Sequence, residues 1–481
     1  MTTGTAIHAD EDAPFDSLSY AARLLDALDG RDVDLPRRRA VHPATRWWEC
    51  GAMALTGPRS GPALMCPLPL ASCADGALLA LQALAAAPEG TLPPGGELLG
   101  ERAALSELAR NGRIAPGGAC RLLNCADGRI ALTLARLEDW ASLPVWLATE
   151  EWLGANFPEA EISAREAIWG GVASAVAGQS VDALVESGRL LSLAIAADRL
   201  PVEPGSAWFE IDCEHPGSPR RGREPPLVVD LSSLWAGPLC THLLAMLGAR
   251  VIKVESTVRP DGARAGNRAF YDLLNHGKAS VALDLQSIDG RDMLRRLLAT
   301  ADIVVEASRP RALLQLGIDP AEYCAAGRAL TWISLTGHGR RAPEGAWIAF
   351  GDDAAIAAGL GALMQRATGE VLFCGDAIAD PLAGMHAALA AWCSHRRGGA
   401  RRISLSLRGV LGHCIRFGDP IDAEALRDRQ HRWTALLHAA AHDTRPPRAR
   451  DPRGAARPFG ADTAAVADTL VRPRAAVVAA R

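Results

Sequence analysis

The residues best placed to do chemistry lie between Ile378 and His386, where a carboxylate, Asp380, stands immediately before Pro381. The apolar stretch from Ala387 to Trp392 follows and predicts a buried helix. An Asp at the N-cap with Pro at the first helical position is a common way to begin a helix, so one interpretation of Asp380 is purely structural. The other is that its carboxylate reacts, and the sequence upstream favours this second interpretation.

Length and composition allow a large globular protein. The 481 residues suffice for two or three domains, and 49% of them are hydrophobic against 22% charged, so a large core can form. The net charge of -4 gives no general attraction to nucleic acid or to an anionic membrane, and we expect neither as a partner. No apolar run without Gly, Pro or charge is long enough to span a bilayer.

The cysteines and the N-terminal residues indicate the cellular compartment in which we expect the protein. The 11 cysteines are scattered and form no C-x-x-C pair, so we expect neither a metal site nor dithiol redox chemistry. Residues 1–16 are polar and acidic, unlike a signal peptide. We therefore expect a soluble, cytoplasmic protein in a reducing compartment.

A break in composition divides the chain at residues 201–226, whose Pro, Gly and charged residues predict a linker. Beyond it, apolar runs alternate with helical patterns. We expect strands at 227–231, 250–255, 281–285, 302–306 and 332–335, with helices at 236–248 and 290–299. This alternation predicts an α/β fold, a doubly wound, mostly parallel, Rossmann-like sheet, in a domain at residues 227–420.

The rest of the chain is less regular. Residues 1–45 form an N-terminal segment with one expected helix at 17–30, and a second helix is expected at 74–87. Two strands around the turn Asp127-Gly128, followed by helical segments, predict a smaller α+β domain within residues 46–200. Arg, Pro and Ala dominate residues 443–459, and we expect residues 421–481 to be largely disordered.

One pattern occurs twice: a Thr-Gly pair, a Cys, a polar residue, and then a Gly that opens an apolar Ala/Leu-rich helix. The first copy has Thr56, Cys66, Ser72 and Gly76, and the second has Thr368, Cys374, Asp380 and Gly384. We interpret this echo as a duplication, which makes residues 46–200 a degenerate repeat combined with the smaller domain. Only the second copy would then carry the carboxylate.

An ordered series of motifs begins at Leu227. It comprises Asp230-Leu231-Ser232, Ala236-Gly237-Pro238, Leu247 to Glu255, Asn275 to Leu285, Ala301 to Glu306, Arg309-Pro310, Leu316-Gly317-Ile318 and Ile333 to Gly339. Each motif is weak alone, but their order and intervals are specific. From Leu227 to about Phe417 the chain resembles the family III CoA-transferases, the CaiB/BaiF superfamily, which includes formyl-CoA and carnitine-CoA transferases and is related to the α-methylacyl-CoA racemases.

The resemblance implies that Asp380 is a nucleophile. In that family the Asp at this position attacks an acyl-CoA thioester, and the enzyme then passes through an aspartyl-CoA thioester before an incoming carboxylic acid reverses the steps. Coenzyme A would thus be a substrate, with no permanently bound cofactor. The expected partners are an acyl-CoA and a carboxylic acid, and the expected assembly is a homodimer.

The resemblance also implies CoA contacts, which we expect across the carboxyl ends of the parallel strands. The candidates are the backbone at Trp235, Ala236 and Gly237, the side chains of Lys253, Arg259, Lys278 and Arg309, and the Gly359 and Gly361 N–H groups as oxyanion donors. A lysine within a strand is often a solvated edge residue, and paired glycines often end a helix. Both interpretations therefore stay open for Lys253 and the glycines.

The chain departs from the family at several contacts. Ser256 replaces a common Arg, with Arg259 and Arg264 as possible substitutes. Ala307-Ser308 replaces an Asn-Phe pair, and Ala357 a common Gln. These changes leave room for a catalytically degenerate paralogue that binds CoA.

A racemase is the second alternative. Racemases of the superfamily pair the Asp with a His before the glycine loop, because moving an α-proton takes a base on each face. Residues 349–354 contain no His, whereas His338 lies upstream and His386 downstream of Asp380. The adjacent pair Asp352 and Asp353 either positions substrate or forms a solvated helix cap.

Overall fold

The computed structural model describes residues 15–30, 32–36, 39–149, 162–201, 207–216, 225–419, 422–439 and 443–471. Contacts divide the chain into two compact units. Unit 1 comprises Met1–Glu210, Leu335–Ala390 and Ser404–Arg450, and unit 2 comprises Ile211–Ser334, Ala391–Ile403 and Asp451–Arg481. The units therefore cross the contiguous boundaries predicted at residues 200, 226 and 420, because the chain returns to unit 1 after the parallel strands.

Unit 2 contains a seven-stranded sheet in the order β4-β10-β9-β8-β5-β6-β7. Its strands are β4 (Glu210–His215), β5 (Leu227–Leu231), β6 (Arg250–Ser256), β7 (Ala279–Leu283), β8 (Ile303–Glu306), β9 (Leu330–Thr336) and β10 (Ala400–Ser406). The pairs β5/β6, β6/β7, β5/β8 and β8/β9 are parallel. The predicted α/β class with a mostly parallel sheet is confirmed, although β4 lies within the segment predicted to be a linker.

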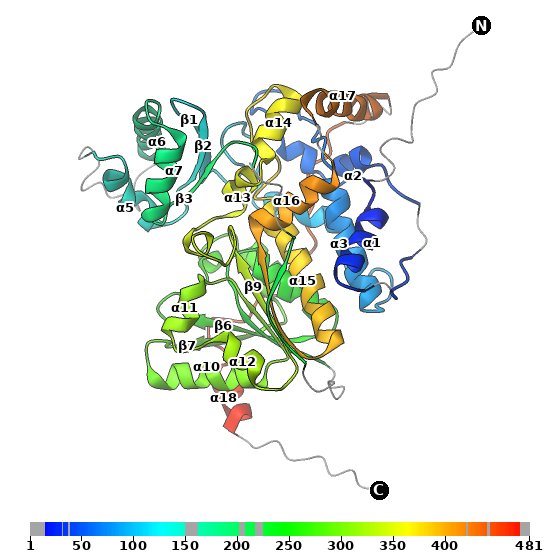
Figure 1. Ribbon diagram of the computed structural model, residues 1–481, viewed down its shortest axis with the longest axis vertical. Helices are drawn as coiled ribbons and strands as arrows, with labels where there is room; N and C mark the ends of the chain where they lie inside the picture. Colours follow the sequence, from blue (N-terminus) through cyan, green and yellow to red (C-terminus); the bar gives the residue numbers. More distant parts are fainter. Residues whose placement is uncertain are drawn as a thin grey trace. The chain divides into compact units, whose positions relative to one another are not determined.

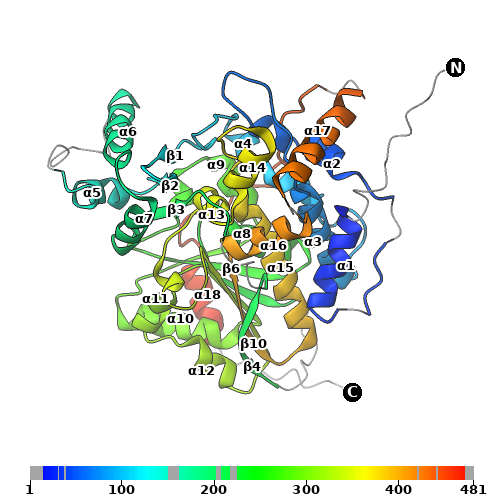
Figure 2. The same cartoon turned by 45° about the horizontal axis from the view of Figure 1, so that its top comes forward.

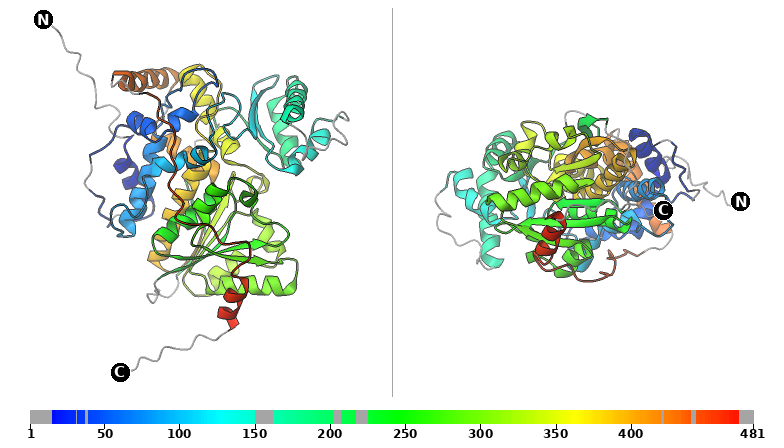
Figure 3. Two further views of the ribbon diagram at one scale, coloured as in Figure 1. Left: turned by 180° about the vertical axis from the view of Figure 1, so that it is seen from behind. Right: turned by 90° about the horizontal axis from the view of Figure 1, so that it is seen from below.

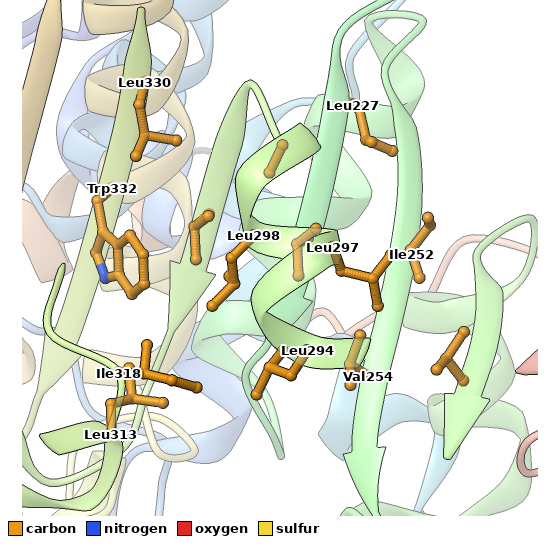
Figure 4. Packing of buried hydrophobic residues seen from close by; sticks show 14 of the residues in the cluster. Leu227, Ile252, Val254, Leu294, Leu297, Leu298, Leu313, Ile318, Leu330 and Trp332 are labelled. Carbon is orange, nitrogen blue, oxygen red and sulfur yellow. The ribbon is translucent and has the colours of Figure 1, made fainter. Parts of the chain in front are cut away.

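Helices connect the parallel strands as the alternation predicted. They are α8 (Ala236–Met246), α9 (Arg268–Asn275), α10 (Ile288–Thr300), α11 (Pro310–Gln315) and α12 (Pro320–Ala325). Leu294, Leu297 and Leu298 recur on one face of α10 and pack against the sheet near Ile252 and Val254 (Figure 4). Burying each such side chain contributes roughly 2 kcal/mol, which makes this interface a main part of the core of unit 2.

Two lysines in unit 2 are buried, not solvated. Lys278 Nζ lies 3.1 Å from Asp230 Oδ2 and donates to Thr241 Oγ1 at 2.7 Å. Lys253 Nζ pairs with Asp261 Oδ2 at 2.9 Å, and both lysine side chains are at most 2% exposed. Burial by itself raises the pKa of Asp230, but the charges of Lys278 and Lys253 bring that pKa down to about 2. The lysine ammonium groups therefore form ion pairs in the interior of unit 2, which corrects the interpretation of Lys253 as a solvated edge residue.

Unit 1 combines helices with a small sheet, and α14 lies against α17 (Figure 2). Its helices outside the small-sheet region are α1 (Ser17–Ala27), α2 (Pro43–Glu49), α3 (Leu70–Leu84), α4 (Glu101–Leu105), α13 (Gly351–Ala357), α14 (Leu360–Thr368), α15 (Ala379–Arg397), α16 (Leu407–Phe417) and α17 (Ala423–Ala439). Of these, α15 continues past Ala390 into unit 2.

The small sheet confirms the predicted hairpin around Asp127-Gly128. It has the antiparallel order β1 (Cys120–Asn124), β2 (Arg129–Thr133) and β3 (Ala194–Ala197), and three helices lie beside it (Figure 1). These helices are α5 (Leu137–Trp146), α6 (Ile162–Val176) and α7 (Val181–Leu190). The third strand was not predicted, because its four residues, Ala-Ile-Ala-Ala, have no alternating pattern.

The expected disorder of residues 421–481 is wrong over most of the described part. This part contains α17 and α18 (Thr463–Val471), and α18 packs beside β7 and α10 (Figure 3). Asp462 accepts from the Ser280 backbone N–H at 2.9 Å, and Thr463 Oγ1 accepts from that of Ala282 at 3.0 Å. The tail thus satisfies polar groups at the edge strand β7, a long-range interaction that composition does not reveal.

We predict that Lys278→Met destabilises the protein by about 3–5 kcal/mol, because it leaves the Asp230 carboxylate buried without its ion-pair partner. Chemical denaturation followed by fluorescence measures the loss. Arg296→Met removes an exposed cation 3.7 Å from Asp292 and should cost no more than about 1 kcal/mol. Equal stability of the two variants would contradict the structural role of Lys278.

Candidate active site

Asp380 is the second residue of α15, so the helix begins one residue before the predicted N-cap. Its backbone N–H donates to the carbonyl of Ala377 at 2.9 Å, and the Ala377 N–H donates to Asp352 Oδ1 at 2.9 Å. Ala377 has φ of +42°, in the left-handed region that a residue with a Cβ rarely adopts. Such strain persists only where the surroundings enforce it, and here it shapes the turn that presents Asp380.

Gly351 packs directly against Asp380. The Gly351 backbone N–H interacts with the Asp380 carboxylate and opposes the rise of its pKa. A Cβ on Gly351 would lie 2.3 Å from Asp380 Oδ2 and 2.3 Å from the Ala377 carbonyl oxygen, so only glycine fits. As the first residue of α13, Gly351 has an N–H without an intrahelical acceptor, which leaves it available to orient a carboxylate.

The protonation of Asp380 reflects burial among other carboxyl groups. Burial raises the pKa of Asp380 to about 7, the charge of Arg102 opposes that rise, and the charges of Asp352 and Asp376 add to it. Burial, followed by the charge of Asp376, likewise raises the pKa of Asp352 to about 7. Near neutral pH these carboxyl groups can therefore exchange protons, as a nucleophile or general acid-base group must.

Arg102 is the cation of the site, and sequence reasoning missed it. Its Nε donates to Asp376 Oδ2 at 2.9 Å and its Nη2 donates to Asp376 Oδ1, a bidentate pair with a fully buried carboxylate. Arg102 lies on the short helix α4, far from Asp380 in the sequence and outside every motif. Only the fold of unit 1 brings it into the site, so no local signal in the sequence indicates it.

The interpretation of Asp353 as a solvated cap is wrong. Asp353 caps the start of α13, since Oδ1 accepts from the Phe350 N–H at 2.9 Å, but the residue is fully buried. The same oxygen accepts from Thr133 Oγ1 of β2 at 2.9 Å, and burial raises the pKa of Asp353 to about 7. Asp353 thus ties α13 to the small sheet within unit 1.

The glycine pair predicted to donate to an oxyanion also has packing roles, and its oxyanion role stays a prediction. Gly359 has φ of +93° and caps the N-terminus of α14. Gly361 lies in the first turn of α14, where a Cβ would come within 2.6 Å of Asp198 Oδ1. The donor that contacts Asp380 is Gly351; its position directly before two acidic residues is the one signal that could have identified it.

The other predicted CoA contacts lie in unit 2. Trp235 is the N-cap of α8, Ala236 is its first residue, and a Cβ on Gly237 would lie 2.1 Å from Ser232 Cβ. Arg259 and Arg309 are exposed, as a phosphate contact requires, whereas Lys253 and Lys278 are engaged in the buried network. The exposed arginines and the α8 N-terminus thus stay candidates for CoA phosphate.

The two histidines considered as racemase bases are buried. His386 is fully buried, with Nδ1 donating to the Leu382 carbonyl at 2.7 Å and Nε2 lying 2.8 Å from the Tyr20 hydroxyl. His338 is 7% exposed and packs edge-on against Trp347. Both ring nitrogens of His386 are therefore engaged in structural hydrogen bonds.

Two features are absent from the ranges that the structure describes: a cluster of metal ligands and a membrane-spanning helix. No group of three or more His, Cys, Asp or Glu side chains there is arranged to hold a metal ion. No helix in the same ranges has the length and apolar character needed to cross a bilayer.

We predict that Asp380→Asn stabilises the protein at pH 8 but not at pH 4. With a folded pKa of about 7, the protonated carboxyl contributes stability that is complete below about pH 4 and lost as the pH rises towards 7. Asn cannot ionise, so the variant should exceed wild type by on the order of 1–3 kcal/mol at pH 8 in denaturation measured across this range. Asp292→Asn, at an exposed position, should follow wild type throughout; an Asp380→Asn variant that does the same would argue against the raised pKa.

Two curated proteins that match this chain are named as CoA-transferases. The chain is 30% identical over 209 residues to a succinate–glutarate CoA-transferase of Agrobacterium fabrum, covering 39% of this chain and 52% of that protein. It is 29% identical over 199 residues to a formyl-CoA:oxalate CoA-transferase of Escherichia coli O6:H1, covering 39% of this chain and 48% of that protein. The chain thus spans about half the length of the curated relatives it matches.

Among solved structures, a CaiB/BaiF family protein from Brucella suis is 25% identical, with a TM-score of 0.35 over 47% of this chain and 59% of that chain. The family model that matches, over residues 226–413, is that of CoA-transferase family III. The resemblance predicted from the motifs is therefore confirmed: residues 226–413 match the model of CoA-transferase family III.

Proposed function

We propose that this protein is a CoA-transferase that moves CoA between an acyl-CoA thioester and a free carboxylic acid through a covalent intermediate on Asp380. One observation carries the proposal: within a CoA-transferase family III region, Asp380 is a carboxylate oriented by the Gly351 N–H and shifted by burial to a pKa of about 7. A carboxyl with that pKa is a better nucleophile than an exposed one, yet is still partly ionised at neutral pH.

The reaction would proceed by acyl and thioester exchange on one carboxyl. Ionised Asp380 attacks the thioester carbonyl carbon, and the C–S bond breaks to give an aspartyl acyl anhydride and CoA thiolate. The thiolate then attacks the Asp380 carbonyl, which forms an aspartyl-CoA thioester and releases the first acid as its carboxylate. A second carboxylate repeats these steps in reverse, so that its acyl-CoA leaves and Asp380 is regenerated.

The surrounding residues have separate roles in this proposal. The Gly351 N–H holds one Asp380 oxygen, which directs the other towards substrate. Arg102 offsets the charges of Asp352 and Asp376 and so keeps a fraction of Asp380 ionised. Within unit 2 itself, Arg259, Arg309 and the α8 backbone at Trp235 to Gly237 are proposed as contacts for CoA phosphates, with no permanently bound cofactor.

The substrates follow from the same chemistry. The A. fabrum and E. coli relatives are named for succinate, glutarate and oxalate, which are carboxylic acids. Their names support an acyl-CoA and a free carboxylic acid as the two partners of this chain.

The racemase alternative is less well supported. It needs a second base facing the α-carbon. Both His386 ring nitrogens are already engaged, and burial lowers the pKa of His338 to about 3, which makes that ring a weak base. The alternative of a degenerate paralogue rests on the departures from the family at Ser256, Ala307-Ser308 and Ala357. These departures alter the region of CoA contact but leave the surroundings of Asp380 intact. A transfer assay therefore separates all three alternatives.

We predict that the wild-type protein, given an acyl-CoA and a free acid without ATP, moves CoA to the acid and leaves the α-carbon unexchanged in D₂O. Asp380→Asn should lower this transfer at least ~10³-fold, since the nucleophile is lost. Mass spectrometry of the Asp380 peptide should detect a covalent adduct in wild type alone, and Asp292→Asn is the matched control.

Deuterium uptake at the α-carbon without CoA migration would assign the racemase instead. CoA binding without adduct, migration or exchange would assign the degenerate paralogue. Near wild-type transfer by the Asn variant would remove Asp380 from the mechanism.

We also propose a cytoplasmic homodimer, since symmetric pairs are the commonest oligomers of soluble proteins. Light scattering at micromolar concentration is expected to give about twice the chain mass of 50.7 kDa. A mass near that of one chain would contradict the dimer.

A further inference from the structure

Unit 1 contains a basic cluster that the proposed mechanism does not use: Arg189 on α7, His338 after β9, Trp347, and Arg408 in the first turn of α16. The Arg189 guanidinium carbon lies 3.6 Å from the centroid of the Trp347 ring. The His338 ring packs edge-on against the same indole, with centroids 5.5 Å apart. The Arg408 backbone N–H donates to the carbonyl of Gly337 at 3.1 Å, which places Arg408 beside His338.

The two arginines repel each other and are not neutralised. Within the described ranges neither guanidinium forms an ion pair, and Arg189 Nε is buried without a hydrogen-bond partner. Burial and the charge of Arg408 lower the pKa of Arg189 to about 10, and the charges of Glu344 and Asp353 offset this only in part. Arg408 also stands at the N-terminal end of a helix, where the helix dipole favours anions over cations.

The two ring nitrogens of His338 are further polar groups of the basic cluster. It is 7% exposed, and in the part of the chain that the structure describes neither ring nitrogen makes a hydrogen bond of ordinary geometry. Burial and the charges of Arg189 and Arg408 lower the pKa of His338 to about 3 despite an opposing interaction with the Ile348 backbone, so the ring is neutral. A neutral ring can donate one hydrogen bond, and a buried polar group without a partner is available to a water or a ligand.

The basic cluster is connected to the surroundings of Asp380. Trp347 lies in the segment that leads directly into Gly351 at the start of α13. The charge of Asp353 raises the pKa of Arg189. The charge of its neighbour Asp352 raises the pKa of Asp380. The cluster therefore flanks the same helix start that orients the nucleophile.

We infer that Arg189, Arg408 and His338 bind the second carboxylate of a dicarboxylic acid whose first carboxylate reacts at the Asp380 intermediate. Guanidinium groups bind carboxylates through paired N–H donors, and His338 can donate a further hydrogen bond. This inference rests on the proposed function and names its acceptor class. A phosphate of CoA has similar oxoanion chemistry, but a carboxylate fits a cluster in the same unit as Asp380.

The test compares acceptors of equal length after the enzyme has been loaded with acetyl-CoA, propionyl-CoA or succinyl-CoA. Glutarate carries a second carboxylate and valerate does not. Arg189→Met and Arg408→Met should each raise the KM for glutarate about 10- to 100-fold, as expected for losing hydrogen bonds to a charged group, and change the KM for valerate less than about 2-fold. Arg296→Met is the surface control, and Arg408→Lys should recover part of the loss.

Turnover of valerate shows that each variant is folded. Equal losses with both acceptors, or a wild type that does not favour glutarate over valerate, would overturn the inference while leaving the transferase intact. A KM increase confined to the acyl-CoA donor would assign the cluster to a CoA phosphate and overturn it as well. Failure of every donor to load wild-type Asp380 would instead count against the proposed function.

Discussion

The partial burial of one carboxyl group, Asp380, is the constraint on which the candidate site in unit 1 depends. Removing a carboxylate from water is costly, and the cost appears here as a pKa near 7. Two interactions favour the ionised form of Asp380: the charge of Arg102 and, to a smaller extent, the Gly351 backbone N–H. Arg102 interacts through its charge with Asp376, Asp352 and Asp380. Because the three carboxyl groups share this one cation, ionisation of any one of them affects ionisation of the others.

The turn before α15 is held in place by residues from the N-terminal part of unit 1. The Gly375 N–H donates to Thr56 Oγ1 at 3.1 Å, the Phe373 N–H donates to the Gly112 carbonyl at 2.9 Å, and Asp376 binds Arg102. These anchors hold the backbone that includes the strained Ala377. The N-terminal part, which the sequence indicates is a degenerate repeat, is thus a structural component of the Asp380 site even though its own copy has Ser72.

Unit 2 also contains a carboxylate removed from water, and neighbouring side chains stabilise it. Strand β5 carries Asp230 into the interior, where Lys278, Thr241 and Ser232 supply its hydrogen bonds. A buried network in which every polar group is hydrogen-bonded fixes one arrangement of the strands and loops around it. Any shift of a strand would leave a buried charge without its partner. The motif residues Asp230, Lys253 and Lys278 therefore describe the interior of this fold as much as a CoA site.

The sequence by itself determined the elements whose signals are local. Apolar runs predicted β5, β6 and β8, the amphipathic pattern predicted α10, and the Asp-Gly turn predicted the β1/β2 hairpin, because strand, helix and turn preferences act over a few residues. The ordered motifs identified the family region and singled out Asp380. Tertiary structure decided what depends on distant contacts: Arg102 beside Asp376, Gly351 against Asp380, and the tail along β7. Those pairings follow from long-range packing and desolvation, which neither composition nor spacing encodes locally.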